Sequence, residues 1–571
     1  MRFSFGLQGE GFKLSILNTR VFDPDSIETM PRTLRLNAAR GGSAAFQVLL
    51  VSDTDFTLNT AAQYALTQRW TRPVLRVAAD GGCTVHIEGM HRDDNRILRA
   101  DSLLSDTAAA VSAGQPVALW IEKEIPADAE PGEQVVTVRF FLSDRDADEV
   151  PAGEASAAIR VWPCTLPAPH EQRFYLDLWQ HSSILARTHE TPLWSDAHFE
   201  VLEKYVRTLG ALGQRAVTLV VSEIPWRGQS CAFEFLDSAN LFEYSIVRVT
   251  RSPDGVFSYD YNAMDRYIAL CERYGIDAEY SLYGLCGVWT EKGEPQFIPG
   301  YPDNIRIRYL DEADGCMKFI RDAADADAYI AALERHFLET GRMDRVRVAA
   351  DEPSDPVKYR RALDHLAAIA PHFRFKAAIN HAEFIPEFGD ALTDFTPYID
   401  CMCREYGKLR EYMASMPGKR FLWYVCCSPD FPNTFLRSAL PESWLIGILT
   451  SYAGMDGFAR WDYNVYPDDP RQSVSYSEFP AGDVNFVYPA KNDAPLLTLR
   501  WKALQRGIRF CELLERLRER DAEAYETACR RVLRTDDLTQ FSRRPPDRNA
   551  LCSTDPADYE ALMVFLLEKL S

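Results

Sequence analysis

The sequence lacks the short motifs that mark several large enzyme classes. It contains no glycine-rich phosphate-binding loop, no Gly-x-Ser-x-Gly elbow and no His-Glu-x-x-His zinc motif. Each of these motifs carries one chemistry: backbone N–H groups that cradle phosphates, an exposed serine nucleophile, or two imidazoles on one helix face that bind zinc. Their absence excludes nucleotide transfer through such a loop, ordinary serine hydrolysis and standard zinc peptidase chemistry.

Basic charge and long apolar runs are also scarce. The chain of 571 residues has 83 Asp and Glu against 63 Lys and Arg, a formal net charge of −20. Nucleic acids and anionic membranes both require a basic face, so neither is expected as a partner, and a neutral ligand fits better. No apolar run is long enough to span a membrane, and the first residues lack the apolar core of a signal peptide. We therefore expect a cytoplasmic protein.

The 13 cysteines show neither the pattern of a disulfide framework nor that of a metal site. Cys401, Cys403, Cys426 and Cys427 lie inside apolar, strand-like runs, where a thiol behaves as a small hydrophobic group. The Cys401-x-Cys403 spacing is wrong for a zinc knuckle, and no His-x-x-x-His segment follows it. The sequence therefore predicts a reducing compartment, no metal and no other cofactor.

An alternation of apolar and polar residues dominates the first part of the chain. Short runs such as 45–51 and 134–140 are separated by turn residues such as Pro131-Gly132. This pattern predicts that residues 1–168 form an all-β sandwich domain. A proline-stiffened segment, 161–169, marks its end.

Residues 169–480 have a different pattern, in which strand-like and amphipathic helical runs alternate as in βα units. The candidate strands are 173–181, 216–223, 277–285, 346–353, 375–381, 398–405, 420–427 and 454–464. Eight such repeats over about 300 residues predict a (β/α)₈ barrel that holds the functional site. Residues 481–571 are expected to form a helical C-terminal region packed on the barrel. Its helices are predicted over 499–520, 521–534 and 556–570, with a break at Pro545-Pro546.

The predicted strand that begins at Val346 carries the strongest candidates for chemistry. Asp351 and Glu352 stand side by side at its end. Pro353 follows, and since it has no N–H to donate, the strand stops there. In parallel α/β proteins the chemistry takes place at the C-terminal ends of the strands. Two adjacent carboxylates also repel each other, which should raise the pKa of one of them.

Other predicted strand ends carry groups suited to a polyhydroxylated ligand. Acids and amides can pair with hydroxyl groups, and aromatic rings can stack on sugar faces. The candidate substrate-binding residues are His181, Tyr283, Asn380, Tyr406, Tyr424, Arg460, Trp461 and Asn464. A structural role is open for several of them: His181 can support the fold, Tyr424 can pack inside the barrel and Trp461 can fill the core.

Two neighbouring acids fit one kind of glycosidase better than another. The usual design places two carboxyls about 5–5.5 Å or 6.5–9.5 Å apart on opposite sides of the glycosidic bond. Neighbouring strand residues suit this poorly, because their side chains leave in opposite directions. In a substrate-assisted design, one carboxyl protonates the leaving oxygen and the other orients a 2-acetamido group, whose carbonyl oxygen is the nucleophile. Spacing alone does not assign the two roles.

The segment Ala350-Asp351-Glu352-Pro353 resembles the catalytic Asp-Glu of glycoside hydrolase family 123, the β-N-acetylgalactosaminidases. Further segments that are similar to this family and its associated uncharacterised domain are 178–181, 432–434, 454–464, 487–489 and 499–508. The resemblance spans residues 160–516. It implies a sandwich followed by a barrel and a retaining mechanism through an oxazolinium intermediate. It also implies that Asp351 holds the acetamide and that Glu352 is the general acid/base.

The sequence therefore predicts an exo-glycosidase that removes terminal 2-acetamido-2-deoxy sugars, such as β-N-acetylgalactosamine, from a small-molecule or oligosaccharide substrate. Two alternatives stay open. One is a glycosidase for a sugar without an acetamido group, with a more distant second carboxylate such as Glu223 or Glu405. The other is a glycan-binding protein that has the fold but no catalytic activity.

Overall fold

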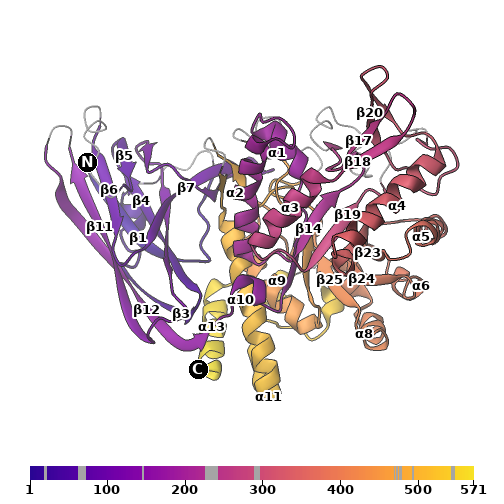
Figure 1. The fold of residues 1–571 in the computed structure, drawn as a ribbon. Helices are drawn as coiled ribbons and strands as arrows, with labels where there is room; N and C mark the ends of the chain where they lie inside the picture. Colours follow the sequence, from indigo (N-terminus) through magenta and orange to yellow (C-terminus); the bar gives the residue numbers. More distant parts are fainter. Residues whose placement is uncertain are drawn as a thin grey trace.

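A computed structural model describes residues 1–17, 22, 24–61, 72–144, 147–225, 242–288, 296–467, 470, 474, 479–490, 494–541 and 547–571. Along the chain, a strand-rich region is followed by a barrel and then by helices (Figure 1). The predicted break at Pro545-Pro546 lies outside the described residues.

The strand-rich region consists of two six-stranded sheets, as the alternating pattern predicts. Every second residue of their strands points inward, so Val48, Val136 and Phe140 are fully buried between the sheets. The strands of the first sheet, in spatial order, are β1 (Phe3–Gly9), β4 (Ser43–Ser52), β10 (Val117–Glu124), β7 (Thr84–Arg92), β8 (Leu98–Leu103) and β2 (Ser15–Ile16). Those of the second are β3 (Thr33–Arg40), β12 (Val150–Thr165), β11 (Gly132–Ser143), β6 (Val74–Ala79), β5 (Phe56–Asn59) and β9 (Ala108–Val111).

The middle region is a nearly closed parallel barrel of eight strands. Their spatial order is β13 (Tyr175–Leu178), β26 (Gly457–Arg460), β25 (Arg420–Tyr424), β24 (Leu392–Pro397), β23 (Arg374–Ile379), β22 (Val346–Asp351), β19 (Glu279–Tyr283) and β14 (Ala216–Val220). Between β13 and β14 the pairing is reduced to one bridge, Leu176 with Gln214. All strands run the same way, so their C-terminal ends meet at one rim of the barrel.

Helices connect the barrel strands. They are α1 (Ser182–Thr188), α2 (Asp196–Leu212), α3 (Asn262–Arg273), α4 (Ala323–Glu339), α5 (Pro356–Ile369), α6 (Phe384–Glu387), α7 (Ile399–Arg404), α8 (Tyr406–Ser415) and α9 (Leu440–Ala453). Helix α5, which follows β22, has a well-defined start: the Asp355 side chain accepts from the N–H groups of Val357 and Lys358, and Pro356 stands at the first helical position.

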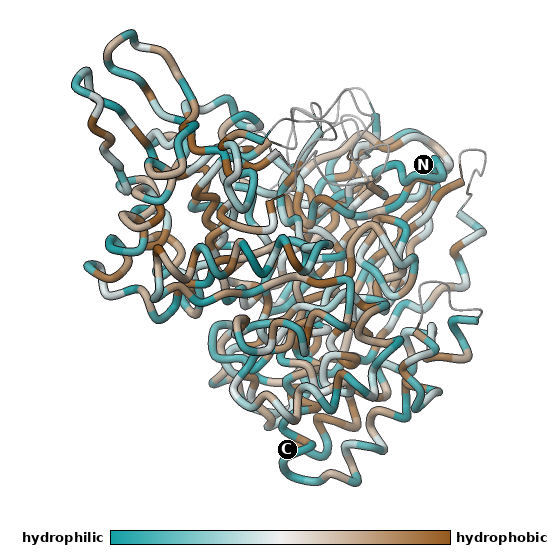
Figure 2. Tube along the Cα trace, turned by 90° about the vertical axis from the view of Figure 1, so that its right-hand side faces the viewer, coloured by the Kyte–Doolittle hydropathy of each residue, from teal (hydrophilic) through white to brown (hydrophobic). Residues whose placement is uncertain are grey.

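The C-terminal helices are α10 (Leu499–Arg520), α11 (Ala522–Cys529), α12 (Arg548–Leu551) and α13 (Pro556–Leu570). Helix α10 packs on α9 of the barrel, and two glycines allow their backbones to touch. A Cβ atom placed on Gly447 would lie 1.8 Å from the carbonyl oxygen of Gly507. Hydrophilic and hydrophobic residues alternate along the outer helices, as expected for elements with one face on the core (Figure 2).

One predicted strand is wrong. The segment 398–405 is not a strand: Ile399–Arg404 form helix α7, and the sixth barrel strand is β24, Leu392–Pro397. The real strand looked too polar to be buried, because Asp394 lies in its middle. Inside the barrel that carboxylate is paired with Arg347 at 2.9 Å and Arg420 at 3.0 Å, which makes its burial possible.

A small sheet projects from the barrel (Figure 1). A hairpin that turns at Pro253–Gly255 is formed by β17 (Arg248–Arg251) and β18 (Phe257–Asp260), and β20 (Arg308–Asp311) and β21 (Cys316–Phe319) complete the sheet. The remaining short strands are β15 (Ile224–Pro225), β16 (Phe242–Glu243), β27 (Tyr488–Pro489) and β28 (Pro495–Leu496). No helix in the described ranges is long and apolar enough to cross a membrane.

Candidate active site

The two adjacent acids lie where β22 leaves the barrel. Asp351 is the last residue of the strand, and Glu352 has a φ of +46°, in the left-handed region that glutamate rarely adopts. The N–H of Glu352 still donates to the carbonyl of Ala378 in β23, at 3.0 Å. A backbone in this region costs on the order of 1–2 kcal/mol, and such strain is concentrated at functional sites.

This turn changes the direction of the Glu352 side chain. In a continuous strand the two carboxyls would point to opposite faces. Here Asp351 and Glu352 both line one cavity of about 450 Å³ at the C-terminal rim. The expectation of opposite directions is therefore wrong, because Glu352 lies outside the regular strand. The residues lining the cavity are Trp179, Asp351, Glu352, Ala378, Asn380, His381, Thr396, Tyr398, Asp400, Arg404, Tyr424, Cys426, Cys427, Ser428, Ala459, Trp461 and Phe479.

The Glu352 carboxyl is held by two neutral donors. The Tyr424 hydroxyl at the end of β25 donates to Oε1, and the Asn380 amide donates to Oε2 at 3.1 Å. No cation of the described chain forms an ion pair with this carboxyl. Burial raises the pKa of Glu352 above its ordinary value, and the hydrogen bonds from Tyr424 and Asn380 oppose this only in part. A glutamate with a raised pKa keeps its proton to higher pH than an exposed glutamate does, as a general acid requires.

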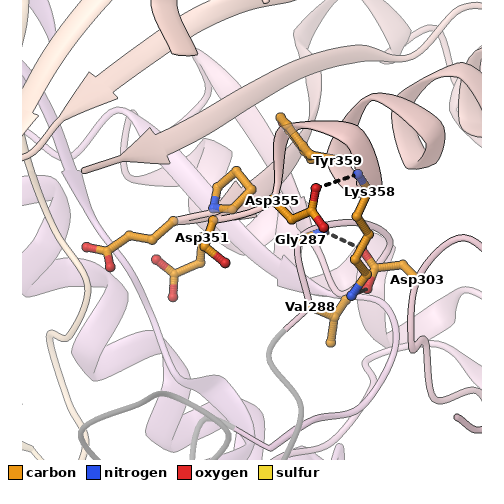
Figure 3. A pocket seen from close by; sticks show the side chains of 10 residues that line it. Gly287, Val288, Asp303, Asp351, Asp355, Lys358 and Tyr359 are labelled. Carbon is orange, nitrogen blue, oxygen red and sulfur yellow. Dashed lines mark hydrogen bonds and ion pairs between the residues drawn. The ribbon is translucent and has the colours of Figure 1, made fainter. Parts of the chain in front are cut away.

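Asp351 lies between the large cavity and a smaller pocket of about 90 Å³. Figure 3 shows Asp351 on one side of this pocket, with Asp303 and Lys358 on the other. Asp303 accepts from the N–H of Gly287 at 2.7 Å, and the Lys358 Nζ lies 3.7 Å from its carboxylate. The polar groups on the far side of the small pocket are thus already paired with one another. The large cavity, in contrast, has room for a sugar ring.

Aromatic side chains form much of the cavity wall. Trp461 packs against Phe479 with ring centroids 4.9 Å apart, and Tyr398 lies 5.4 Å from Tyr424. Trp179, from the end of β13, completes this wall. Flat apolar rings beside hydrogen-bonding groups are the combination that a sugar needs, since its ring faces are apolar and its edges carry hydroxyls.

The structure brings only part of the predicted substrate-binding set together. Asn380, Tyr424 and Trp461 line the cavity with the two acids. Tyr283 is buried and reaches only a very small hollow beside Asp351. Tyr406 lies on α8, away from the cavity, and its hydroxyl donates to the carbonyl of Ala453 at 3.1 Å.

His181 lies beneath the wall and does not line the cavity. It is fully buried between the carboxylates of Asp462 and Glu243, and its Nε2 lies 3.0 Å from the carbonyl oxygen of Trp461. Burial alone would lower the pKa of His181, but the two carboxylates outweigh it and raise the pKa to about 9. The Asn464 side chain is also internal, since its amide donates to the His181 carbonyl at 2.9 Å. Both residues support the wall that carries Trp461.

Arg460 is fully buried and likewise does not line the cavity. Its guanidinium pairs with Asp483 at 2.7 Å and donates to Asn433 at 3.1 Å. Of the 454–464 segment, Ala459 and Trp461 therefore line the cavity, whereas Arg460 and Asn464 lie behind it. A sequence pattern shows that such polar residues are present but not whether they face a cavity or one another.

Several lining residues were missed by the sequence reasoning. Tyr398 and Asp400 were placed in the wrongly predicted strand, although they mark the turn from β24 into α7. Cys426 and Cys427 were treated as core residues, yet both line the cavity beyond the end of β25. Their position directly after a strand end is the one sequence feature that predicts a place in the cavity, because functional residues of barrels lie on the loops that follow the strands.

The distant carboxylates considered as alternatives lie elsewhere. Glu223 forms two hydrogen bonds with Arg308, at 2.6 and 2.9 Å, and Glu405 pairs with Lys408 on the surface at 3.1 Å. Neither lines the cavity, whereas Asp400 does and is paired with Arg404. Among the described residues no group of three or more His, Cys, Asp or Glu side chains could hold a metal ion.

Comparison with known proteins agrees with this architecture. A family 123 glycoside hydrolase from Clostridium perfringens, studied for glycolipid glycan hydrolysis, has the same fold, with a TM-score of 0.72 and 17% identity over 100% of this chain and 97% of that one. A putative glycoside hydrolase from Bacteroides vulgatus gives a TM-score of 0.33 and 10% identity over 85% and 79% of the two chains. No curated protein sequence matches. The model of the glycoside hydrolase 123 catalytic domain matches residues 179–517, more than half of the chain, which therefore belongs to this family.

Proposed function

We propose that this family 123 glycoside hydrolase is a retaining exo-enzyme that removes terminal β-linked 2-acetamido-2-deoxy sugars, N-acetylgalactosamine or a related N-acetylhexosamine. The observation that carries this proposal is the shared cavity of Asp351 and Glu352, with Glu352 held by neutral donors. An acid with a raised pKa and a second acid beside it are what substrate-assisted cleavage requires.

In the first step, Glu352 protonates the glycosidic oxygen as the bond from that oxygen to C1 breaks. Asp351 accepts a hydrogen bond from the acetamide N–H and so aligns the acetamide carbonyl oxygen, which attacks C1 and forms an oxazolinium ion. In the second step, the Glu352 carboxylate takes a proton from a water molecule that attacks C1 and opens the ring. Two inversions at C1 leave the product with the configuration of the substrate.

Tyr424 and Asn380 support both states of the acid. Their hydrogen bonds stabilise the carboxylate after it has given up its proton, while burial favours the protonated form beforehand. Opposing effects of this kind keep the pKa of an acid/base residue near the working pH, which suits a group that must act in both directions.

The position of Asp400 supports a second candidate mechanism, in which two separate carboxylates act on the sugar. It is a carboxylate on the cavity wall apart from the Asp351-Glu352 pair, so it could serve as the second acid of a two-carboxylate enzyme on a sugar without an acetamido group. Its pairing with Arg404 weakens that role, because a paired carboxylate is a poorer base or nucleophile.

A panel of nitrophenyl glycosides separates these possibilities. We expect turnover of the β-N-acetylgalactosaminide or β-N-acetylglucosaminide, inhibition by the matching thiazoline, which mimics the cyclised intermediate, and the β-anomer as the first product in ¹H NMR. Turnover limited to plain hexosides, abolished by Asp400→Asn, would establish the two-carboxylate alternative. Binding of glycans without any turnover would make the protein a lectin. Since the Clostridium protein acts on glycolipid glycans, one such glycan belongs in the panel.

The cytoplasm remains the proposed site of action. This proposed location is supported by buried cysteines that are not in disulfides, such as Cys401, Cys403 and Cys511. In an oxidising compartment, cysteines are more often arranged as disulfides.

A further inference from the structure

Two adjacent cysteines line the cavity near Glu352. Cys426 and Cys427 follow β25, and their Sγ atoms lie 3.8 Å apart. Both side chains are half-buried, and both belong to the wall that also contains the Glu352 carboxyl. Two thiols this close can hold one soft atom through two sulfur bonds, which a single cysteine cannot do.

The loop that carries these thiols is firmly held. The Cys426 N–H donates to the carbonyl of Ser428 at 3.1 Å, and the buried Asn433 amide donates to the Cys426 carbonyl at 3.0 Å. Asn433 in turn accepts from Arg460 at 3.1 Å, and Arg460 is fixed by its ion pair with Asp483. Arg460, which the sequence suggested for substrate binding, thus belongs instead to a buried network that holds the backbone of this loop. A site held in place before binding loses less entropy when its ligand arrives.

The environment of Cys426 disfavours chemistry that needs the thiolate of this residue. The neighbouring Cys427 thiol and burial raise the pKa of Cys426 well above its ordinary value. Alkylating agents and peroxides react with the thiolate, so they should react slowly here. Condensation with a trivalent arsenical does not need a thiolate at the start, because the oxygen on arsenic can carry both thiol protons away as water.

We propose that Cys426 and Cys427 form a bidentate binding site for trivalent arsenicals and that its occupation closes the sugar cavity. In the reaction, two S–H bonds and the arsenic–oxygen bond break, two As–S bonds form, and the oxygen leaves as water. Arsenic stays trivalent and sulfur is not oxidised, so no other reactant is needed. The bound group then lies in the cavity that holds Glu352 and takes up space that a sugar ring needs.

Phenylarsine oxide tests the site on the full-length, reduced protein. We expect intact-mass spectrometry to show one phenylarsenic group added with loss of one water. We also expect glycosidase activity to fall by about tenfold or more, because an enclosed ligand site cannot hold both groups. The dithiol 2,3-dimercaptopropanol should restore activity, whereas 2-mercaptoethanol at the same concentration should not. Iodoacetamide, which needs a thiolate, should modify Cys426 far more slowly.

The variants Cys426→Ser and Cys427→Ser should each abolish the dithiol-specific inhibition, measured against the untreated rate of the same variant. Cys316→Ser is the matched control, since Cys316 is an exposed single thiol and its loss should leave the response intact. Cys401→Ser is a second control, since Cys401 and Cys403 are buried, and its loss should also leave the response intact. Unchanged inhibition in Cys427→Ser, or no adduct on the wild type, would overturn the proposal.

Two further measurements test the location of the adduct and its effect on turnover even if a variant does not fold. If a serine variant does not fold, proteolytic mapping of the labelled wild type locates the arsenic, and an adduct on any peptide without Cys426 and Cys427 refutes the site. An adduct on this pair that leaves turnover unchanged refutes closure of the cavity. The mass measurement does not depend on the proposed sugar specificity, so a failure of the arsenic site and a failure of the proposed function can be distinguished.

Discussion

The barrel contains two groups of acids that differ in their surroundings. In the buried interior of the barrel, its closed end, Asp177 and Glu279 share the Lys376 ammonium, at 2.8 and 2.6 Å, and Arg420 binds Glu279 at 2.7 Å. At the C-terminal rim, the hydrogen-bond partners of Glu352 in the described part of the chain are the neutral donors Asn380 and Tyr424. The first group is buried and neutralised by cations, whereas Glu352 is half-buried and pairs with no cation of the described residues.

The difference shows in the proton affinities. Burial alone would raise the pKa of Glu279, but Lys376 and Arg420 outweigh it and lower the pKa to about 2. For Glu352 burial dominates, and its pKa is raised. One barrel thus uses carboxylates in two ways: ion-paired acids stabilise its closed end, and a carboxyl without a cation is available for proton transfer at the open end.

The largest effect is expected from Glu352→Gln. Glutamine keeps the shape of the side chain but cannot give up a proton, and general acid/base catalysis contributes on the order of 10²–10⁴ in rate. We expect kcat for a nitrophenyl N-acetylhexosaminide to fall by about 10³, with little change in thermal unfolding. Activated leaving groups need less protonation, so turnover of the glycosyl fluoride of the same sugar should fall less. A variant with near wild-type turnover of both substrates would show that Glu352 is not the acid.

A substitution at the closed end of the barrel should lower the stability of the fold rather than the activity. Lys376→Met leaves Asp177 and Glu279 buried without the cation they share, and the loss of one partner of a buried ion pair costs about 3–5 kcal/mol. Urea unfolding should show this loss, whereas turnover per folded molecule should change little. Lys408→Met is the control, because Lys408 pairs with Glu405 in solvent and its loss should be undetectable in the same titration. Equal stability of the two variants would contradict the contrast between the two ends.

Only one of these two groups of acids could be predicted from the sequence. Asp351 and Glu352 could be found because adjacent acids at a strand end form a local pattern. The interior cluster could not, since Asp177, Lys376 and Asp394 look like polar interruptions until strands far apart in sequence bring them together. The same limit explains the misplaced sixth strand. It also explains why Arg460 was assigned to the ligand: a lone sequence does not show whether a polar side chain meets another or faces a cavity.

Backbone conformation was a second limit. The left-handed turn at Glu352 arises from the way β22 ends against β23, and it places both acids in one cavity. Nothing in the residues Asp351-Glu352-Pro353 specifies that φ, because glutamate has no preference for it. The sandwich, the barrel and the long C-terminal helices were predictable because their periodic patterns extend over many residues.

Tyr424→Phe should change the pH dependence of the reaction. The Tyr424 hydrogen bond lowers the pKa of Glu352 because it stabilises the carboxylate, so its loss should raise that pKa further. Glu352 would stay protonated to higher pH, and the basic limb of the kcat/KM profile should move upward. A hydrogen bond to a charged group contributes about 1.5–3 kcal/mol, so a rate loss of roughly ten- to a hundredfold is expected.

Tyr398→Phe is the matched control for this change. Tyr398 lines the same cavity, but its hydroxyl contacts Ser428 at 2.6 Å and not Glu352. Its removal can weaken substrate binding, but it should not move the basic limb. A basic limb that shifts equally in both variants, or in neither, would mean that the Tyr424 hydroxyl does not control the proton affinity of Glu352.

The last test of the closed end follows stability as a function of pH and concerns Glu279. Its pKa in the folded protein lies below the ordinary 4.5, at about 2, so its charge stabilises the fold above pH 4.5 and this contribution is lost as the pH falls toward 2. Glutamine at this position does not titrate. The difference in unfolding free energy between wild type and Glu279→Gln should therefore be largest near neutral pH and shrink through that window. A difference that stays constant from pH 6 to pH 3 would show that the interior carboxylate contributes through packing and hydrogen bonds rather than through its charge. The contrast between the two groups of acids would then depend only on the raised pKa of Glu352.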